Sequence, residues 1–188
     1  FNSSLPLCRD LNKVAGQILA EVPPAMWIGW SLGGLITLAA MLQQPSHVLK
    51  AALIAATPSF SKQPEWEYGV DPAQQQAFTE GLESDFEGTL KQFSLQCFGA
   101  PWLKESLKRL GKTSAVDDVP SRENLQAGLH LVYNNNLVMD LNNFAIKTKA
   151  SIAIALHNDL CYFPLVIQDF IIPTYRLIVG IFPIPYRQ

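Results

Sequence analysis

The sequence predicts an α/β fold in which a mostly parallel sheet is flanked by helices. Three observations lead to this prediction. Continuous apolar segments of strand length occur at residues 25–29 and 49–56. Segments with helical periodicity precede and separate them, and the connections are short. Helices that alternate with apolar strands are typical of parallel sheets, whose strands are buried on both faces.

The elements follow one another in a simple order. Apolar side chains recur at helical spacing over residues 4–21 and predict an amphipathic helix, which ends at Pro23. The strand at 25–29 comes next. A second helix is predicted to open at Gly33 and to stop at Pro45. Helix, strand, helix and strand therefore alternate before residue 57.

After Phe60 the sequence becomes more polar, and it stays polar, with few segments typical of strands, to about Asn136. We therefore expect residues 60–136 to form a helical lid, inserted between two parts of the α/β core at 1–59 and 137–188. Helices are predicted at 73–82, 85–98, 102–110 and 122–133, and strands at 151–156 and 177–182.

Composition narrows the possible functions. The chain has 188 residues, 48% of them hydrophobic and 16% charged, which suits one globular domain. A formal net charge of −2 gives no general attraction to nucleic acid. The three cysteines lack metal or disulfide spacing, so reduced thiols in a cytosolic protein are expected. No apolar run reaches the ~18 residues of a membrane span.

Residues 29–33, Gly-Trp-Ser-Leu-Gly, match the Gly-x-Ser-x-Gly pattern of a serine-nucleophile elbow. The serine of such a motif sits on a tight, strained turn between strand and helix, and small neighbours let the backbone approach. The Leu32 N–H would then donate to a developing oxyanion, helped by the helix dipole. The alternative is a glycine-rich turn with a bystander serine. The buried strand before Ser31 and the helix after it favour a nucleophile.

A nucleophilic serine needs a base, and the base needs an acid that orients it. After an elbow of this kind the chain order is serine, then acid, then histidine. Asp159 is the best acid, because it lies in the turn after the apolar run 151–156. Asp140 and Asp169 are weaker alternatives, and a capping role for Asp159 stays open.

The base is not visible where it is expected. The three histidines, His47, His130 and His157, all precede Asp159. A surface or structural role is the simpler interpretation of each. His157 would need unusual geometry to act as a relocated base, since it is two residues from Asp159.

Residues 27–35, Trp-Ile-Gly-Trp-Ser-Leu-Gly-Gly-Leu, closely resemble the elbow of the pimeloyl-[acyl-carrier protein] methyl ester carboxylesterases of biotin synthesis. The likeness continues through residues 55–61 and Glu65-Trp66 and spans roughly residues 10–132. It implies an α/β-hydrolase fold with a four-helix lid. It also implies hydrolysis of the methyl ester of pimeloyl-acyl carrier protein, with no metal and no cofactor.

The resemblance assigns roles to single residues. Ser31 looks like the nucleophile, Asp159 like the triad acid, and Trp30 and Leu32 like substrate contacts. The residues that look like the lid lining of the acyl channel are Phe93, Ser94, Leu95 and Gln96.

A basic cluster falls on one face of a predicted lid helix, at Lys104, Lys108 and Arg109. The resemblance implies that basic lid residues meet the acidic acyl carrier protein, and ion pairs would serve chiefly to steer the two proteins together. An ordinary solvated helix face is the alternative. We expect a cytoplasmic monomer with no nucleic-acid partner and no membrane partner.

Two departures from the family pattern matter. The family begins with strands and a His-Gly-x-Gly loop that supplies the second oxyanion donor, and this chain starts after that region. The family ends on a Gly-x-x-His-x-Pro-Phe type segment, and Pro183 stands where that histidine is expected. We therefore expect an N-terminally truncated chain with a divergent or frame-altered C-terminus, and weak or no activity.

Three functional hypotheses follow. The first is a biotin-pathway carboxylesterase that works through an acyl-enzyme on Ser31. The second is a catalytically impaired relic that only binds an acyl chain or a carrier protein. The third is another short-chain esterase or a thioesterase on the same scaffold, since a fold alone does not choose among them.

Overall fold

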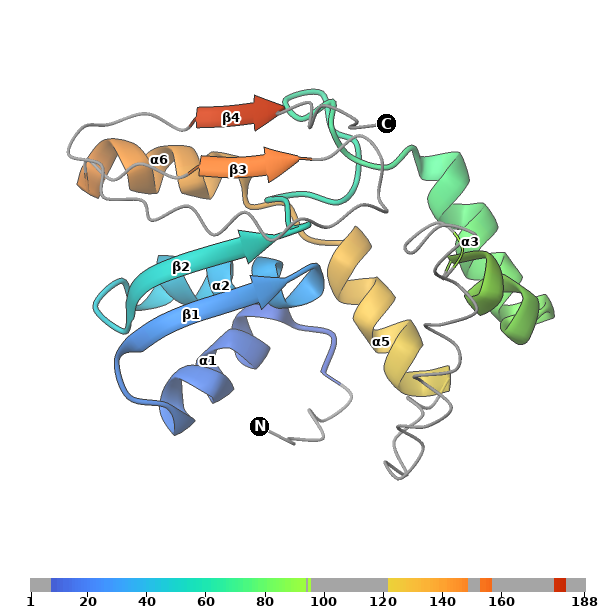
Figure 1. Cartoon of the computed structure of the whole chain (residues 1–188), viewed down its shortest axis with the longest axis horizontal. Coiled ribbons are helices and arrows are strands. Elements are labelled where there is room, and N and C mark those ends of the chain that lie inside the picture. The colour runs from blue at the N-terminus through green and yellow to red at the C-terminus, as the bar shows by residue number, and fades with distance from the viewer. Residues whose placement is uncertain (1–7, 94, 96–121, 149–152, 157–177, 182–188) are drawn as a thin grey trace, which may run out of the picture.

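The computed structural model describes residues 8–93, 95, 122–148, 153–156 and 178–181 (Figure 1). The helices are α1 (Leu11–Glu21), α2 (Leu32–Gln43), α3 (Pro72–Ser84), α5 (Arg122–Tyr133) and α6 (Val138–Thr148), and residues 86–93 are also helical. The strands are β1 (Ala25–Trp30), β2 (Val48–Ile54), β3 (Ala153–Leu156) and β4 (Ile178–Ile181).

The described strands pair in parallel, as predicted. β1 pairs with β2 so that Trp30 lies opposite Ile54, and β3 pairs with β4. β2 also contacts β3. The described strands form two pairs, and all four arrows in Figure 1 point the same way, so the carboxyl ends of both pairs face the same side. The prediction of a mostly parallel sheet with flanking helices is confirmed.

The first helix starts later than its apolar pattern suggests. Within the predicted range 4–21, residues 8–10 are not helical, and α1 begins at Leu11. The cause is a cap, because the Asp10 carboxylate accepts a hydrogen bond of 3.1 Å from the Lys13 N–H. From there Leu11, Val14 and Leu19 turn one buried stripe toward α2.

The core centres on α2. Every residue from Gly34 to Ala40 is buried, so this helix is enclosed on more than one side. Leu35 is 0% exposed and Leu38 is 1% exposed. The cluster around them draws on α1, the start of β2, α5 and α6, through Leu11, Val14, Leu19, Val48, Leu131 and Leu141.

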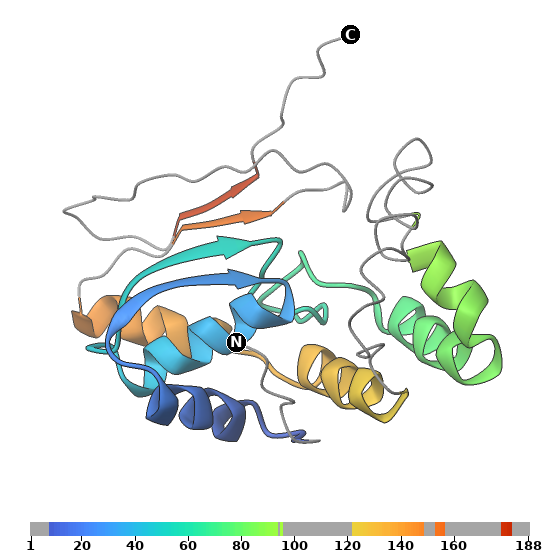
Figure 2. The ribbon, with the colours of Figure 1, turned by 60° about the horizontal axis from the view of Figure 1, so that its bottom comes forward.

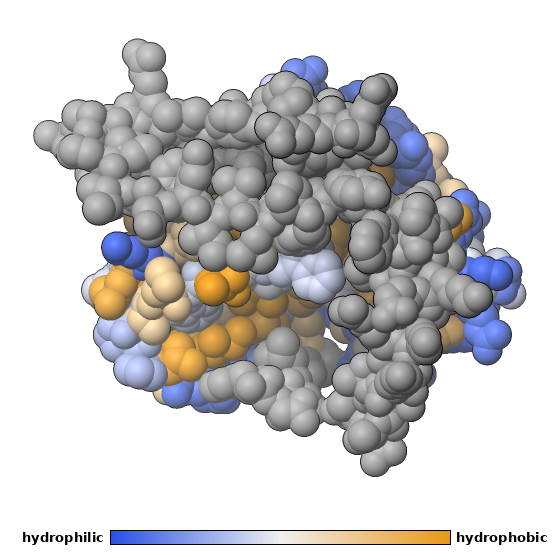
Figure 3. All heavy atoms as spheres, in the orientation of Figure 1, coloured by the Kyte–Doolittle hydropathy of each residue, from blue (hydrophilic) through white to orange (hydrophobic). Residues whose placement is uncertain are grey.

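The expectation that residues 25–29 are buried on both faces is wrong. Met26 and Ile28 are 64% and 66% exposed, and Trp30 follows them on the same face at 57%. Among the described helices, α1, α2 and α6 all lie on one side of the strands (Figure 2). Figure 3 shows the resulting apolar surface over β1 and β2.

The helices of the expected insertion lie beyond the carboxyl ends of β1 and β2 (Figure 1). The predicted helix at 122–133 is confirmed as α5, and the one at 73–82 lies within α3. The predicted helix at 102–110 falls outside the described residues. Sequence reasoning missed α6 altogether.

None of the helices in the described ranges has the length and apolar character needed to cross a bilayer.

Candidate active site

Ser31 occupies the strained turn that the motif predicts. Its φ of 51° lies in the left-handed region, which a residue with a side chain enters at a cost of about 1–3 kcal/mol. The Ser31 N–H donates to the Ile54 carbonyl over 2.9 Å, which ties the turn to β2. The Ser31 carbonyl accepts from the N–H of Gly34 at 2.9 Å and Leu35 at 3.2 Å. The turn between β1 and α2 is therefore held from both sides.

The two glycines that this turn requires are Gly29, the first residue of the pentapeptide, and Gly34, which lies just after it. A Cβ on Gly29 would lie 2.6 Å from the Gly33 carbonyl oxygen, and one on Gly34 would lie 2.2 Å from the Ala56 Cβ. A Cβ on Gly33 would meet no atom within 4 Å. The expected need for a small residue thus holds at Gly29, but after the serine it falls on Gly34.

The N-terminus of α2 faces the space beside Ser31. Leu32 is the first residue of this helix, so its N–H has no carbonyl within the helix to bond. No acidic side chain stands in the first turn to neutralise the positive end of the dipole. The Ser31 hydroxyl does not cap the helix either. These features suit a nucleophile beside an oxyanion donor.

A second strained residue adjoins the first. Ala55, with a φ of 46°, follows β2 as Ser31 follows β1, and the two strands end in register. β2 ends at Ile54, directly before Ala55 and two residues before the predicted strand end. Ligands of parallel α/β sheets bind beyond the carboxyl ends of the strands, and backbone strain gathers at functional sites.

His47 lies at the wrong edge of the sheet to serve Ser31. It precedes Val48, which is paired with Ala25 at the start of β1, whereas Ser31 follows the last residue of that strand. Six residues of strand separate the two edges, roughly 20 Å at about 3.3 Å per residue. The His47 backbone carbonyl accepts a hydrogen bond from the Ala25 N–H at 2.9 Å, which holds this residue at the start of β1.

His130 faces away from the elbow. The side of α5 that meets the elbow is marked by Gly128, where a Cβ would lie 3.7 Å from the Leu32 Cδ2. His130 is two residues further on, about 200° around the helix. Its Nδ1 is buried and has no hydrogen-bond partner in the part of the chain that the structure describes. Neither described histidine is therefore placed as the base of Ser31.

The remaining triad candidates lie mostly outside the described residues. Asp159, Asp169 and His157 are among them. Asp140 is exposed in the first turn of α6. No group of three His, Cys, Asp or Glu side chains in the described ranges is arranged to hold a metal ion.

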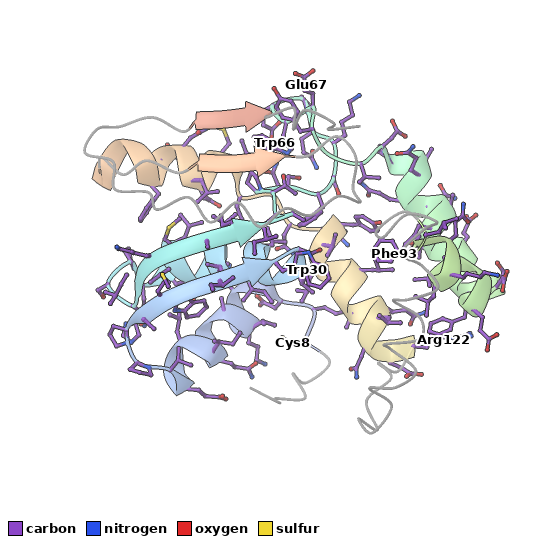
Figure 4. All side chains as sticks on the ribbon, viewed as in Figure 1. Cys8, Trp30, Trp66, Glu67, Phe93 and Arg122 are labelled. Atoms are coloured by element: carbon purple, nitrogen blue, oxygen red, sulfur yellow. The ribbon has the colours of Figure 1, made fainter. Side chains whose placement is uncertain are left out.

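The predicted substrate contacts are only partly brought together. Trp30 stands at the carboxyl end of β1, and Phe93 lies on the other side of α5 in the view of Figure 4. Phe93 is 45% and Leu95 is 40% exposed, and the Phe93 ring centroid is 5.5 Å from that of Phe78. The other predicted lid and docking residues, Ser94, Gln96, Lys104, Lys108 and Arg109, lie outside the described residues.

Helix α5 is joined to residues 86–93 at its start. The Arg122 guanidinium carbon lies 5.3 Å from the centroid of the Phe86 ring, within the range of a cation–π contact. Both residues come from the insertion predicted at 60–136, and Arg122 is labelled in Figure 4. The contact links two of its helices to each other rather than to the core.

The sequence analysis included residues 55–61 in the family likeness but assigned no role to the hydroxyl side chains of this segment, which follows β2. Thr57, Ser59 and Ser61 are buried, with exposures of 6%, 0% and 6%. Their alternation was the available signal, because hydroxyl side chains at every second position of an extended segment share one side. Nearby, burial raises the pKa of the Tyr133 phenol above its ordinary value.

Comparison with known proteins gives consistent results. A family model described as the alpha/beta hydrolase fold matches residues 3–130. Curated relatives named pimeloyl-[acyl-carrier protein] methyl ester esterase include one from Vibrio atlanticus, 34% identical over 73% of this chain and 55% of its own length. Another, from Stenotrophomonas maltophilia, is 39% identical over 68% of this chain and 49% of its own.

Solved structures agree at the level of the fold. A hydrolase from Oleispira antarctica aligns with a TM-score of 0.63 at 13% identity, over 84% of this chain and 57% of that one. An esterase from Exiguobacterium antarcticum aligns with a TM-score of 0.62 at 23% identity, over 84% and 58%. The chain spans about half the length of the curated relatives it matches.

Proposed function

The chain belongs to the alpha/beta hydrolase fold family, and on this premise we propose that the protein is a carboxylesterase with Ser31 as its nucleophile. The observation that supports this most directly is the Ser31 turn itself. A φ of 51° at a non-glycine residue is costly, and Ser31 stands directly before Leu32, whose N–H has no carbonyl within the helix to bond.

The proposed reaction is acyl transfer in two halves. The Ser31 oxygen attacks the ester carbonyl, and the negative charge that forms on the carbonyl oxygen is bound by the Leu32 N–H. One such donor contributes about 3 kcal/mol to the stabilisation of a tetrahedral intermediate. The proton that leaves the Ser31 hydroxyl passes to the departing alcohol, and water then hydrolyses the acyl-enzyme, which releases the acid and restores the hydroxyl.

For the substrate we propose the methyl ester of pimeloyl-acyl carrier protein. The support is that the curated relatives carry this substrate in their names and are 34–39% identical to the chain. Trp30, Leu32 and the residues from Phe93 to Gln96 are proposed to contact the acyl chain. Lys104, Lys108 and Arg109 are proposed to meet the carrier protein, and the enzyme is proposed to act as a monomer.

Asp159 is the proposed acid of the triad. The expected rate of ester hydrolysis is low, because neither His47 nor His130 is placed to act as the base. A serine without its histidine partner loses several powers of ten in turnover. Because His47 and His130 are both misplaced for this role, an acyl-binding chain with impaired catalysis is the second candidate function.

A burst experiment tests the nucleophile. We expect a p-nitrophenyl ester to release p-nitrophenol in a burst of up to one equivalent, followed by slow turnover, and we expect Ser31→Ala to abolish the burst. Ser46→Ala is the matched control, because this exposed serine lies beside His47 at the opposite edge of the sheet. A burst that survives in Ser31→Ala, or none in the unchanged chain, would contradict the esterase proposal.

A further inference from the structure

The segment from Ala56 to Ser61 leaves the end of β2 and rests directly on the nucleophile turn. Ala56 is 2% exposed, and its Cβ fills the place beside Gly34 where a larger residue would clash. Thr57, Pro58 and Ser59 follow and are also buried. Any group attached to this segment is thereby held at a set position relative to Ser31.

Three buried hydroxyls link the residues of this segment in series. The Thr57 hydroxyl donates to the Ser59 carbonyl over 2.8 Å and accepts from the Trp66 indole N–H over 3.0 Å. The Ser59 hydroxyl donates to the Ser61 carbonyl over 2.8 Å. Each hydroxyl is therefore satisfied inside the protein, where bonds in series reinforce one another.

The last hydroxyl of the series contacts the start of α3 and the end of α5, two helices of the predicted lid. The Ser61 hydroxyl donates to the Tyr133 carbonyl, at the end of α5, over 2.6 Å. It also lies 3.3 Å from the Gln75 Oε1 in the first turns of α3. The Gln75 amide in turn donates to the Val70 carbonyl over 2.8 Å, which fixes its orientation.

Backbone hydrogen bonds also connect this segment to the residues just before α6, where the chain returns to the core. The Leu137 N–H, just before α6, donates to the Pro58 carbonyl over 2.9 Å. Ser59 also forms a bridge with Asn136. The chain thus leaves the core near residue 61 and returns near residue 137 at the same buried segment.

We propose that Thr57, Ser59 and Ser61 are positioning residues that set where the helices α3 and α5 stand relative to Ser31. The inference rests on the proposed function, in which these helices cover the acyl chain. Its physical basis is that Ser61 is the one buried side chain in this network that faces both α3 and α5. A change there is expected to displace both helices together and leave the elbow in place.

Hydrogen exchange resolved by peptide tests this proposal. In Ser61→Ala we expect the amides of α3 and of α5 to exchange about tenfold faster, because the Tyr133 carbonyl and the Gln75 amide oxygen lose a shared donor. The amides of α1, α2 and β1 are expected to keep their protection. Ser84→Ala is the matched control, since among the described residues this exposed serine donates its hydroxyl hydrogen bond within α3, to the Glu80 carbonyl.

A second variant keeps the test decisive if Ser61→Ala fails to fold. Gln75→Leu removes the contact with α3 alone, so we expect faster exchange in α3 and unchanged exchange in α5. Equal acceleration throughout the chain, or no change in either helix in both variants, would overturn the proposal.

A kinetic comparison separates positioning from general support. Ser61→Ala is expected to raise the KM for a long-chain p-nitrophenyl ester severalfold while kcat changes little, and to leave the KM for p-nitrophenyl acetate unchanged. An equal rise in both KM values would count against positioning. Failure of the esterase proposal shows instead as the absence of a Ser31-dependent burst, and the exchange result does not depend on it.

Discussion

The glycines around Ser31 differ in what surrounds them, although the sequence presents them as a single motif. Gly29 and Gly34 stand against backbone and against Ala56, whereas Gly33 faces open space. The strained serine can be held only because the first residues of α2 approach the end of β1 so closely. The glycines at positions 29 and 34 are therefore needed for close packing between β1, α2 and Ala56, and not only for the local backbone conformation of the turn.

The first residue-scale prediction compares two neighbouring substitutions. Gly34→Ala is expected to lower the free energy of unfolding by about 1–3 kcal/mol, because its methyl group would overlap Ala56. Gly33→Ala is the matched control and is expected to be neutral or to stabilise α2 by up to about 1 kcal/mol. Urea denaturation measures both, and equal losses in the two variants would show that the contact with Ala56 is not the cause.

The second residue-scale prediction concerns alkaline pH. Burial raises the pKa of Tyr133 in the folded state, so the folded chain holds this proton more tightly than the unfolded chain does. The associated stability is fully present below the ordinary tyrosine pKa of about 10 and is lost as the pH rises above it. As the pH rises above about 10, the denaturation midpoint of the unchanged chain should fall relative to that of Tyr133→Phe, which cannot titrate at this position. Parallel curves throughout would contradict a raised pKa.

At the scale of elements, the bounds of helices were predicted best where local signals are strong. Residues 122–133 were predicted as a helix and are α5, and Asp10 explains the one late start. α6 was missed because its segment carries asparagines and an aspartate that favour caps and turns in isolation. Contact with α2 stabilises it in the fold.

The element-scale prediction concerns the two faces of the elbow region. Leu35→Ala is expected to lower the free energy of unfolding by about 2–5 kcal/mol, since Leu35 is 0% exposed. Ile28→Ala should change it by no more than about 0.5 kcal/mol, because Ile28 is 66% exposed. Thermal and urea denaturation of both variants test the difference. A large loss in Ile28→Ala would show that this face of β1 is covered in solution.

At the scale of the whole molecule, the parallel sheet explains where the site lies. Ser31 and Ala55 follow the ends of neighbouring strands and so meet at one edge, and α3 and α5 also lie beyond that edge. The same geometry excludes His47 as the base of Ser31, because His47 precedes β2 and so lies at the opposite edge. A residue can therefore belong to this site when it follows the carboxyl end of a strand, and not when it precedes the strand.

The sequence by itself determined the elbow, the parallel order of β1 and β2, and the likeness to esterases. Strand, serine, glycines and helix are contiguous in the elbow, so a pattern of a few residues is enough to recognise it. Only the tertiary structure decided which glycine is crowded, which face of β1 is covered, and that the hydroxyls of residues 57–61 join α3 to α5. These features arise where segments distant in the chain pack together, and no local pattern encodes the distance between them.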